Sequence, residues 1–224
     1  MRTVTGSADA LAIYQEYEDL VRGAGSPLAD QFAPPHPDPV GAFSTAFPGL
    51  DLPDELAAWW AWHDGITQSL GIGAPIGGSN MLFRSMAQTI DLRRMELDIA
   101  EEAAEPPDIT AELIWPHTWI PVLATQDSTF AIELAPRGRG TVLFRDRREM
   151  GRNAPTAAQS WPVVVQWWST LLRIGATRWD PTALRHGRWV TDEKMVPDEL
   201  KGNPLAYSPH PSRYAPQFHP LFPY

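Results

Sequence analysis

The residues best suited to chemistry in this chain are its histidines, which could bind a metal or transfer a proton with a nearby carboxylate. His63 directly precedes Asp64, and His36 lies in a proline-rich segment, while His117 and Asp127 stand apart in the sequence. No two histidines have the spacing of a helical ligand pair such as H-E-x-x-H, which would place both imidazoles on one helix face. Their sequence contexts favour capping or surface roles. We therefore expect no catalytic residue, no metal site and no cofactor.

Other signatures of catalysis or phosphate binding are also missing from the sequence. Cysteine is absent, which excludes disulfides, thiol catalysis and cysteine-based zinc sites. There is no G-x-S-x-G nucleophile elbow. The glycine-rich segment 71–78 is not followed by the Lys-Ser/Thr pair of a phosphate-binding loop, so we predict a flexible surface loop. The adjacent carboxylates Glu101 and Glu102 fall on a predicted exposed helix face, where nothing would perturb them.

The composition favours a folded acidic protein rather than a nucleic-acid-binding or membrane protein. The 224 residues are 43% hydrophobic with ten tryptophans, which is enough for one domain with a sizeable core. The net charge of −9 argues against nucleic acid as a partner and agrees with a basic protein partner. No apolar run approaches the roughly 20 residues of a membrane span, and no signal peptide is recognised. We expect a cytoplasmic protein that does not bind membranes.

The clearest predicted element is a short helix over residues 53–64. Pro53 suits the first helical position, where its missing N–H costs nothing, and the next two carboxylates complement the helix dipole. Gly65 supplies the left-handed position that ends the helix. One inward face is formed by Leu52, Leu56, Trp59, Trp60 and His63. Trp62 falls off that face, which makes it either a partner anchor or a partly covered core residue.

The remaining elements predict an α+β domain followed by an arm. Helices are predicted over 7–21, 40–47, 85–104 and 161–174, and the third has a capping box of Ser85 and Gln88. Strands are predicted over 81–84, 119–123, 129–134 and 141–144, with the last two as an antiparallel hairpin. Pro121 marks an edge or an end of its strand. After Pro181, prolines interrupt regular structure, but interspersed aromatic residues predict an extended arm packed on its own domain or on a second subunit.

In the order and spacing of these elements, residues 39–175 resemble the SUKH superfamily, which includes yeast cell-wall-assembly regulators and many bacterial immunity proteins. The matching residues begin with Val40, Phe47-Pro48-Gly49, Leu52-Pro53, Trp59-Trp60, His63-Asp64-Gly65 and the segment 81–85. They continue with Trp119-Ile120-Pro121-Val122, the strands 129–134 and 140–144, and the helix with Trp167, Leu171 and Leu172. The turn Gln126-Asp127-Ser128 departs from the pattern, because family members often carry Gly or Asp-Gly there.

The resemblance implies an α+β fold with a mostly antiparallel sheet flanked by helices, and a binding function without catalytic residues. In bacteria, many members neutralise a cognate toxin, often a nuclease. The resemblance also implies that Leu52, Pro53, Trp119 and Pro121 determine the fold, and Gly65 joins them through its capping position. We expect a domain over residues 1–185 and a Pro/aromatic-rich arm over 186–224, which lies outside the resemblance.

An immunity protein that blocks a nuclease would cover a basic groove, with carboxylates in place of phosphates and aromatic side chains as anchors. The candidate carboxylates are Asp64, Glu96, Asp98, Glu101, Glu102, Glu105, Asp108 and Asp127. The candidate anchors are Trp62 and Trp115. A solvated helix face is the simpler interpretation of such an acidic run.

We therefore expect a binding protein that neutralises a basic toxin by occlusion. The alternative is a regulatory or scaffolding protein of the same fold that uses its Pro-rich arm. An arginine-rich stretch over 137–152 could pair with the acidic helix within the chain or across a homodimer, and the oligomeric state is left open.

Overall fold

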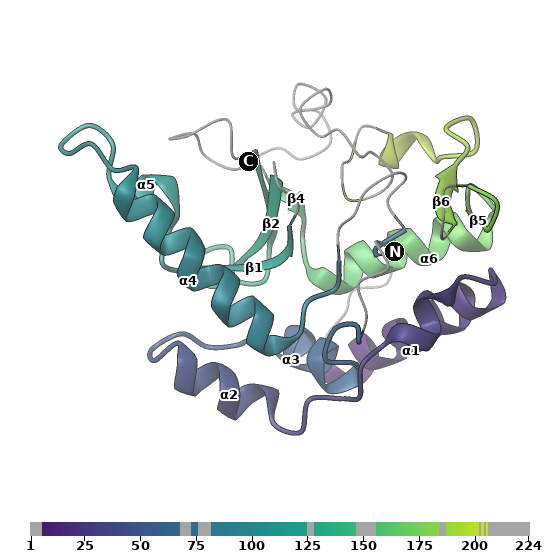
Figure 1. The fold of residues 1–224 in the computed structure, drawn as a ribbon, viewed down its shortest axis with the longest axis horizontal. Helices are drawn as coiled ribbons and strands as arrows, with labels where there is room; N and C mark the ends of the chain where they lie inside the picture. The colour runs from purple at the N-terminus through teal and green to yellow at the C-terminus, as the bar shows by residue number, and fades with distance from the viewer. Residues whose placement is uncertain are drawn as a thin grey trace.

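An antiparallel sheet with strand order β1-β2-β3-β4 forms the centre of the fold (Figure 1). The computed structural model describes residues 6–67, 73–75, 82–124, 128–146, 156–183, 187–201, 203 and 205. The strands of this sheet are β1 (Trp119–Ala124), β2 (Ser128–Glu133), β3 (Val142–Asp146) and β4 (Thr156–Ala158). The α-helices are α1 (Ser7–Gly23), α2 (Pro39–Ala46), α3 (Asp54–Trp62), α4 (Met86–Glu102), α5 (Ala111–Ile114) and α6 (Trp161–Arg173). The 3₁₀ helices η1 (Pro27–Gln31) and η2 (Asp198–Leu200) and a two-stranded sheet of β5 (Thr177–Asp180) and β6 (Arg188–Thr191) complete the described elements.

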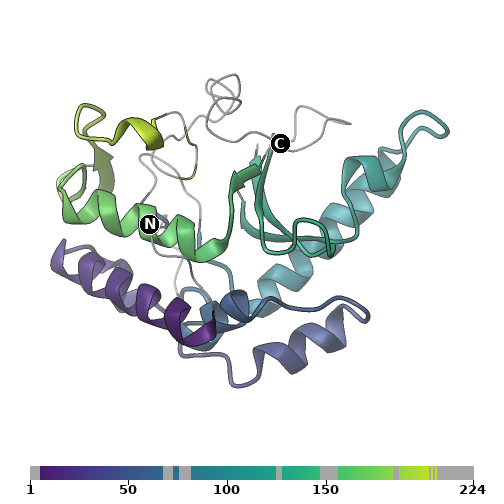
Figure 2. The same ribbon diagram turned by 180° about the vertical axis from the view of Figure 1, so that it is seen from behind.

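Helices cover both faces of the central sheet, because side chains along β2 and β3 alternate between two apolar clusters. Phe130, Ile132 and Phe144 face the main core, which also contains buried residues of α1, α3 and α6. Ala131 and Leu143 face the opposite way, into a smaller cluster under α4 and α5. Figure 2 shows the same arrangement from behind, with α1 along α6 on one side of the molecule and α4 on the other. The α+β fold class, with a mostly antiparallel sheet flanked by helices, is confirmed.

Aromatic side chains supply much of the main core. The ring of Trp59 in α3 lies edge-on to Tyr14 of α1 at 5.0 Å between centroids, and to Trp161 of α6 at 5.2 Å. Such edge-to-face pairs add to the large apolar area that each ring buries. Tyr14 also donates a hydrogen bond to the carbonyl of Glu55 at 2.8 Å. The three helices are therefore locked together by rings from each of them.

Several predicted element boundaries agree with the structure to within a few residues. The capping box of Ser85 and Gln88 is present at the start of α4. The strands at 129–134 and 141–144 do pair antiparallel, as β2 and β3. Pro121 lies on β1, which is an edge strand of the sheet, beside an irregularity in its pairing with β2. Pro53 is the N-cap of α3 rather than its first helical residue.

The prediction of a strand at 81–84 is wrong for residues 82–84, and position 81 lies outside the described residues. A strand needs a neighbouring strand to complete its hydrogen bonds. This segment instead meets α3: the carbonyl of Arg84 accepts a hydrogen bond from Nε1 of Trp60 at 3.2 Å. The apolar pattern does mark a buried segment, since Phe83 lies in the main core. Contacts with α3 take the place of the hydrogen bonds to a neighbouring strand.

The segment that begins at residue 186 contains regular structure that its prolines concealed. β6 pairs with β5, so the proposed boundary between residues 185 and 186 falls inside a hairpin. Beyond it, Val196, Leu200 and Leu205 are buried, and the carbonyl of Leu205 accepts a 2.6 Å hydrogen bond from Nε1 of Trp168. The described part of this segment therefore packs on its own domain, mainly against α6. Residues 206–224 lie outside the described residues.

The glycine-rich segment is described only at residues 73–75, and those residues are buried. The carbonyl of Gly73 accepts a hydrogen bond from Nε1 of Trp189 at 3.2 Å. This part is therefore not the surface loop that its composition predicts. Within the described residues, no helix has both the length and the apolar character of a membrane span.

Candidate protein-binding surface

Helix α4 carries four of the eight candidate carboxylates, and its start is fixed by the segment that follows α3. Oδ1 of Asp64 accepts a hydrogen bond from the N–H of Met86 at 2.6 Å, in addition to the capping box. Gly65 has φ of +79°, and a Cβ atom there would lie 2.5 Å from the backbone nitrogen of Ser85. Only glycine allows this approach. Asp64 thus caps α4 through one carboxylate oxygen while remaining partly exposed, and its role toward a partner stays a prediction.

Glu96 lies on the inner face of α4 and is only 2% exposed. It accepts a hydrogen bond from Oγ1 of Thr129 at 3.1 Å. Thr129 is paired in register with Arg145 on β3, and this arginine is itself buried. A buried carboxylate requires polar partners of this kind. Glu96 therefore anchors α4 to the sheet and does not face a partner, which corrects its assignment to the binding surface.

The two tryptophans predicted as anchors are also buried. Trp115 is 1% exposed, with the Arg145 guanidinium 5.4 Å from its ring centroid and Trp119 packed edge-on at 5.4 Å. Trp62 is 6% exposed and packs against Phe32 at 4.8 Å. Trp62 lies outside the helix face formed by Leu56 and Trp59, but α1 and the segment at Phe32 cover the side of α3 on which Trp62 lies. Neither ring offers a surface to a partner in this structure.

The outer face of α4 and the segment after it remain exposed. All five further carboxylates are on the surface: Asp98, Glu101, Glu102, Glu105 and Asp108. Residues 95–116 contain no lysine or arginine. Within the described part of the chain, none of these five carboxylates forms an ion pair. We call residues 95–114 the acidic arm. The remaining candidate, Asp127, lies outside the described residues.

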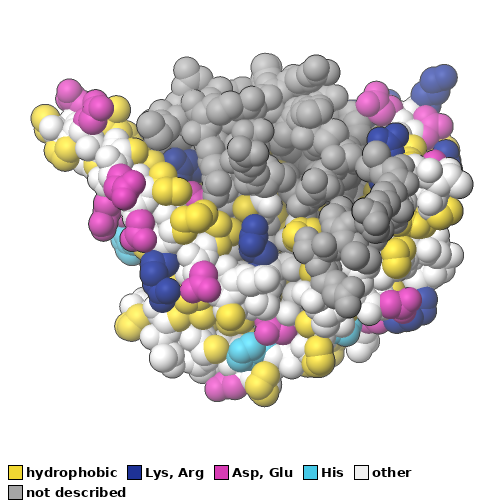
Figure 3. All heavy atoms as spheres, viewed as in Figure 1, with side chains coloured by type: hydrophobic (Ala, Val, Ile, Leu, Met, Phe, Trp, Pro, Cys, Tyr) yellow, Lys and Arg dark blue, Asp and Glu magenta, His cyan; other side chains and the backbone are white. Residues whose placement is uncertain are grey.

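The acidic arm projects from the body of the protein (Figures 1 and 2). It is held in shape by a cluster in which Ala100 and Ile114 pack on Trp119. At its tip, Glu105 and Ile109 exchange two backbone hydrogen bonds, of 2.8 and 3.1 Å. Figure 3 shows acidic side chains gathered along this projecting part, with apolar side chains among them. The arm is therefore a preformed, negatively charged projection.

Sequence reasoning missed the apolar part of this surface. Met95, Ile99 and Leu113 are 42%, 41% and 41% exposed. Met95 and Ile99 are four residues apart and therefore adjacent on α4. The sequence alone could not separate Met95 and Ile99 from the core, because they are three and seven residues beyond the buried Leu92 and therefore share its side of the helix. The neighbouring acidic residues predict a charged surface and give no sign of the apolar side chains among them.

The three histidines considered for catalysis each have a separate local partner. Nδ1 of His36 accepts the N–H of Asp38 at 3.1 Å, and Nδ1 of His117 lies 3.0 Å from Oε1 of Glu112. Nδ1 of His63 lies 2.7 Å from the carbonyl oxygen of Ala33. Among the described residues, no group of three or more His, Cys, Asp or Glu side chains could hold a metal ion.

Glu18 is the centre of a small network at the end of α3. Its carboxylate receives Nε1 of Trp62 at 3.2 Å and Nη2 of Arg22 at 3.0 Å, and it lies 3.1 Å from Nε2 of His63. Partial burial alone would raise the pKa of Glu18. The hydrogen bonds from His63, Arg22 and Trp62 outweigh that effect and hold the pKa below its ordinary value. This network connects α1 to the end of α3, so we assign Glu18 and His63 a structural role.

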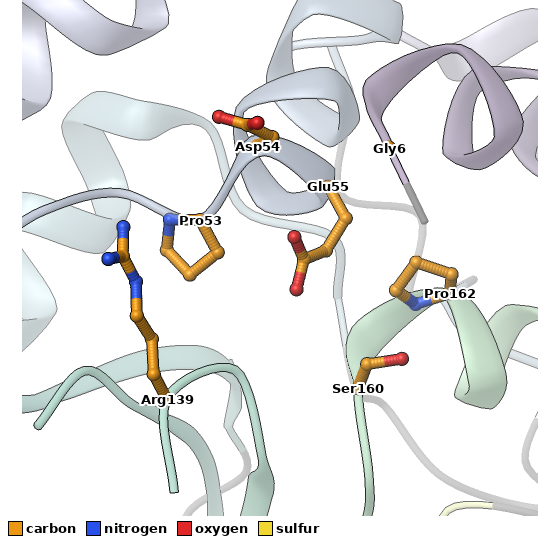
Figure 4. Close-up of a pocket in the computed structure, with 7 residues that line it drawn as sticks. All are labelled: Gly6, Pro53, Asp54, Glu55, Arg139, Ser160 and Pro162. Atoms are coloured by element: carbon orange, nitrogen blue, oxygen red, sulfur yellow. The ribbon is translucent and has the colours of Figure 1, made fainter. Parts of the chain in front are cut away.

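A cavity of about 430 Å³ lies where three helices begin, and Figure 4 shows the residues that line it. Gly6, Pro53 and Ser160 are the N-caps of α1, α3 and α6, and their helix dipoles favour negative charge. Asp54 and Glu55 line the same cavity and already supply that charge. Arg139 is 3.6 Å from Asp51. Among the described lining residues, Ser160 has no histidine beside it that could activate it, so these residues assemble no nucleophile.

Comparison with models of known protein families finds no match for this chain, and comparison with curated proteins finds none either. The likeness to the SUKH superfamily therefore depends on the residues quoted from the sequence.

Proposed function

We propose that this chain is a non-catalytic binding protein that recognises a basic partner protein through its acidic arm. The observation that carries the proposal is the set of five exposed carboxylates that form no ion pair among the described residues, on a projecting, preformed element that has no lysine or arginine. Unpaired like charges of this density repel one another, and a basic partner relieves that repulsion. Complementary charge also steers the encounter and raises the association rate.

The resemblance to SUKH proteins directs the proposal to an immunity function. The partner is then a cognate toxin, such as a nuclease, whose substrate-binding groove is basic. Binding by the arm would place carboxylates where the phosphates of the substrate bind, which occludes the groove without any chemical step. In this form of the proposal the protein acts stoichiometrically.

Affinity capture tests the proposal directly. The tagged protein is used to capture partners from its native cell lysate at low and at near-physiological salt, with identification by mass spectrometry. We expect one basic protein with a toxin-like domain, held in roughly equal amount and more strongly at low salt. A variant that combines Asp98→Asn, Glu101→Gln, Glu102→Gln and Glu105→Gln should lose it. Asp19→Asn, which neutralises one exposed carboxylate on α1, should retain it, and each arm substitution made singly should lose less of it than the combined variant. Retention by the arm variant would contradict the proposal.

A regulatory or scaffolding role through the segment 186–224 is the alternative function. Packing of Val196, Leu200 and Leu205 against the domain shows that the described part of that segment is not a free arm. Truncation after residue 185 would damage the fold, so the informative truncation removes only residues 206–224. Loss of the captured partner after this truncation, with retention by the arm variant, would favour the scaffold.

A further inference from the structure

The outer face of α4 has an apolar strip that nothing in the described part of the chain covers. The described residues include six exposed large hydrophobic side chains, and three of them, Met95, Ile99 and Leu113, lie on the acidic arm. The inner face of the same helix is already buried, with Leu92 and Ala100 packed beneath it. Met95 and Ile99 are three and seven residues beyond Leu92, so the strip continues the buried apolar face of α4 onto the exposed surface of the helix. Exposed apolar side chains that extend beyond the packed face of a helix indicate a further packing partner.

The spacing of this strip suits a helix. Met95 and Ile99 form part of an i, i+4 row, which is the ridge that packs into the groove of a neighbouring helix. Leu113 on α5 extends the exposed apolar surface, because α5 packs beside α4. An extended strand would need a free sheet edge, whereas β1, the edge strand nearest to α4, is buried along its whole length.

The charges around the strip specify the chemistry of that helix. Asp98 and Glu102 are each three residues beyond one of the strip residues, so they lie beside Met95 and Ile99 on the surface of α4. The one exposed arginine on this face, Arg94, is 3.3 Å from Asp91. A second copy of the chain meeting this face symmetrically would set carboxylates against carboxylates, which is unfavourable. The face therefore suits a partner that brings lysine or arginine beside its apolar side chains.

We propose that the outer face of α4, with Leu113 of α5, binds a basic amphipathic helix of the partner protein, an inference that rests on the proposed function and specifies its contact. The apolar strip supplies affinity by removing Met95, Ile99 and Leu113 from water. The flanking carboxylates orient the helix and accelerate its association.

A synthetic peptide tests this contact without the natural partner. The probe is a fluorescent, end-capped helix of about 18 residues, with leucine at positions i, i+3, i+4 and i+7 and lysine elsewhere. A control peptide has the same composition rearranged so that leucines no longer share a helix face. We expect the full chain to bind the probe more tightly than the control peptide in fluorescence anisotropy. Equal binding of both peptides would show attraction by net charge only and would overturn the inference.

Two double variants separate the apolar and charged contributions. Met95→Ser with Ile99→Ser should weaken binding of the probe by at least about tenfold at every salt concentration, as expected for loss of a central apolar contact. Asp98→Asn with Glu102→Gln should weaken it mainly at low salt and flatten the salt dependence. The control, Val40→Ser with Asp19→Asn, changes one exposed apolar and one exposed acidic residue elsewhere and should bind like the wild type. Circular dichroism melts verify that all variants fold. Unchanged binding by both α4 variants would overturn the inference.

Failure of this inference and failure of the proposed function are distinguishable. If the α4 variants still capture the basic lysate protein, the contact lies elsewhere and this inference is wrong, while the binding function stands. If the wild type binds the probe through α4 but captures no basic protein, the surface is supported and the proposed function fails.

Discussion

Gly65 lies against the backbone at the start of α4, the helix that leads into the acidic arm. Its substitution is the sharpest test of the fold. At φ of +79°, alanine would pay the left-handed backbone penalty of about 1–2 kcal/mol. Its Cβ would also lie 2.5 Å from the nitrogen of Ser85 and 2.7 Å from the carbonyl carbon of Arg84, both of them backbone atoms that cannot rotate away. Separation of these segments would further weaken the cap from Asp64 to Met86, and a lost cap costs about 1 kcal/mol.

Together these effects predict that Gly65→Ala destabilises the protein by about 2–4 kcal/mol, in the range of other strained or clashing substitutions. The matched control is Gly25→Ala. Gly25 has φ of +72°, but no heavy atom would lie within 4 Å of its Cβ, so only the backbone penalty applies. Urea denaturation followed by tryptophan fluorescence measures both, and a constant m value verifies that the change is in stability. Equal losses for the two variants would refute the close approach of Gly65 to the start of α4.

Three further predictions test other parts of the account. Glu18→Gln should destabilise the protein at neutral pH. The difference in stability from the wild type should shrink as the pH falls through the lowered pKa of Glu18, because only the ionised carboxylate stabilises the fold. A difference that grows in acid would contradict the network around Glu18. Glu96→Ala should lower the free energy of unfolding by about 1–3 kcal/mol, because it removes a buried hydrogen-bond acceptor. Asp98→Ala should leave the melting temperature unchanged. Equal melting temperatures for the two variants would place Glu96 at the surface. Leu205→Ala should lower the free energy of unfolding by about 2–5 kcal/mol in denaturant, because Leu205 is buried. Met195→Ala should be nearly neutral, because Met195 is 46% exposed. A neutral Leu205→Ala would show that the segment around Leu205 does not pack on the domain.

The helices were predictable where one strong local signal marked them. The capping box at Ser85 and the apolar spacing of α6 needed no tertiary information, and both elements lie where the sequence predicts them. For Trp62 the spacing left two roles open, a partner anchor or a partly covered core residue, and the burial of its ring supports the second. Helix α3 is covered on more than one side, and only the tertiary arrangement reveals that.

The binding surface was predictable in charge but not in detail. The run of carboxylates after Glu96 is visible in the sequence, and five of its members are exposed. Which carboxylate turns inward depends on the register of α4 against Thr129 and Arg145, residues far away in the chain. In the same way, strand β6 was hidden by nearby prolines, and its pairing with β5 depends on Gly187 lying against Trp179.

We propose above all that the acidic arm binds a basic protein. The most direct test of this proposal is the association rate of the purified captured partner, measured across ionic strength for the wild type and for the variant that neutralises Asp98, Glu101, Glu102 and Glu105. We expect a rate that falls steeply with salt for the wild type, and a slower rate with a much weaker salt dependence for the variant. Identical rates and salt dependence for the two proteins would contradict the proposal.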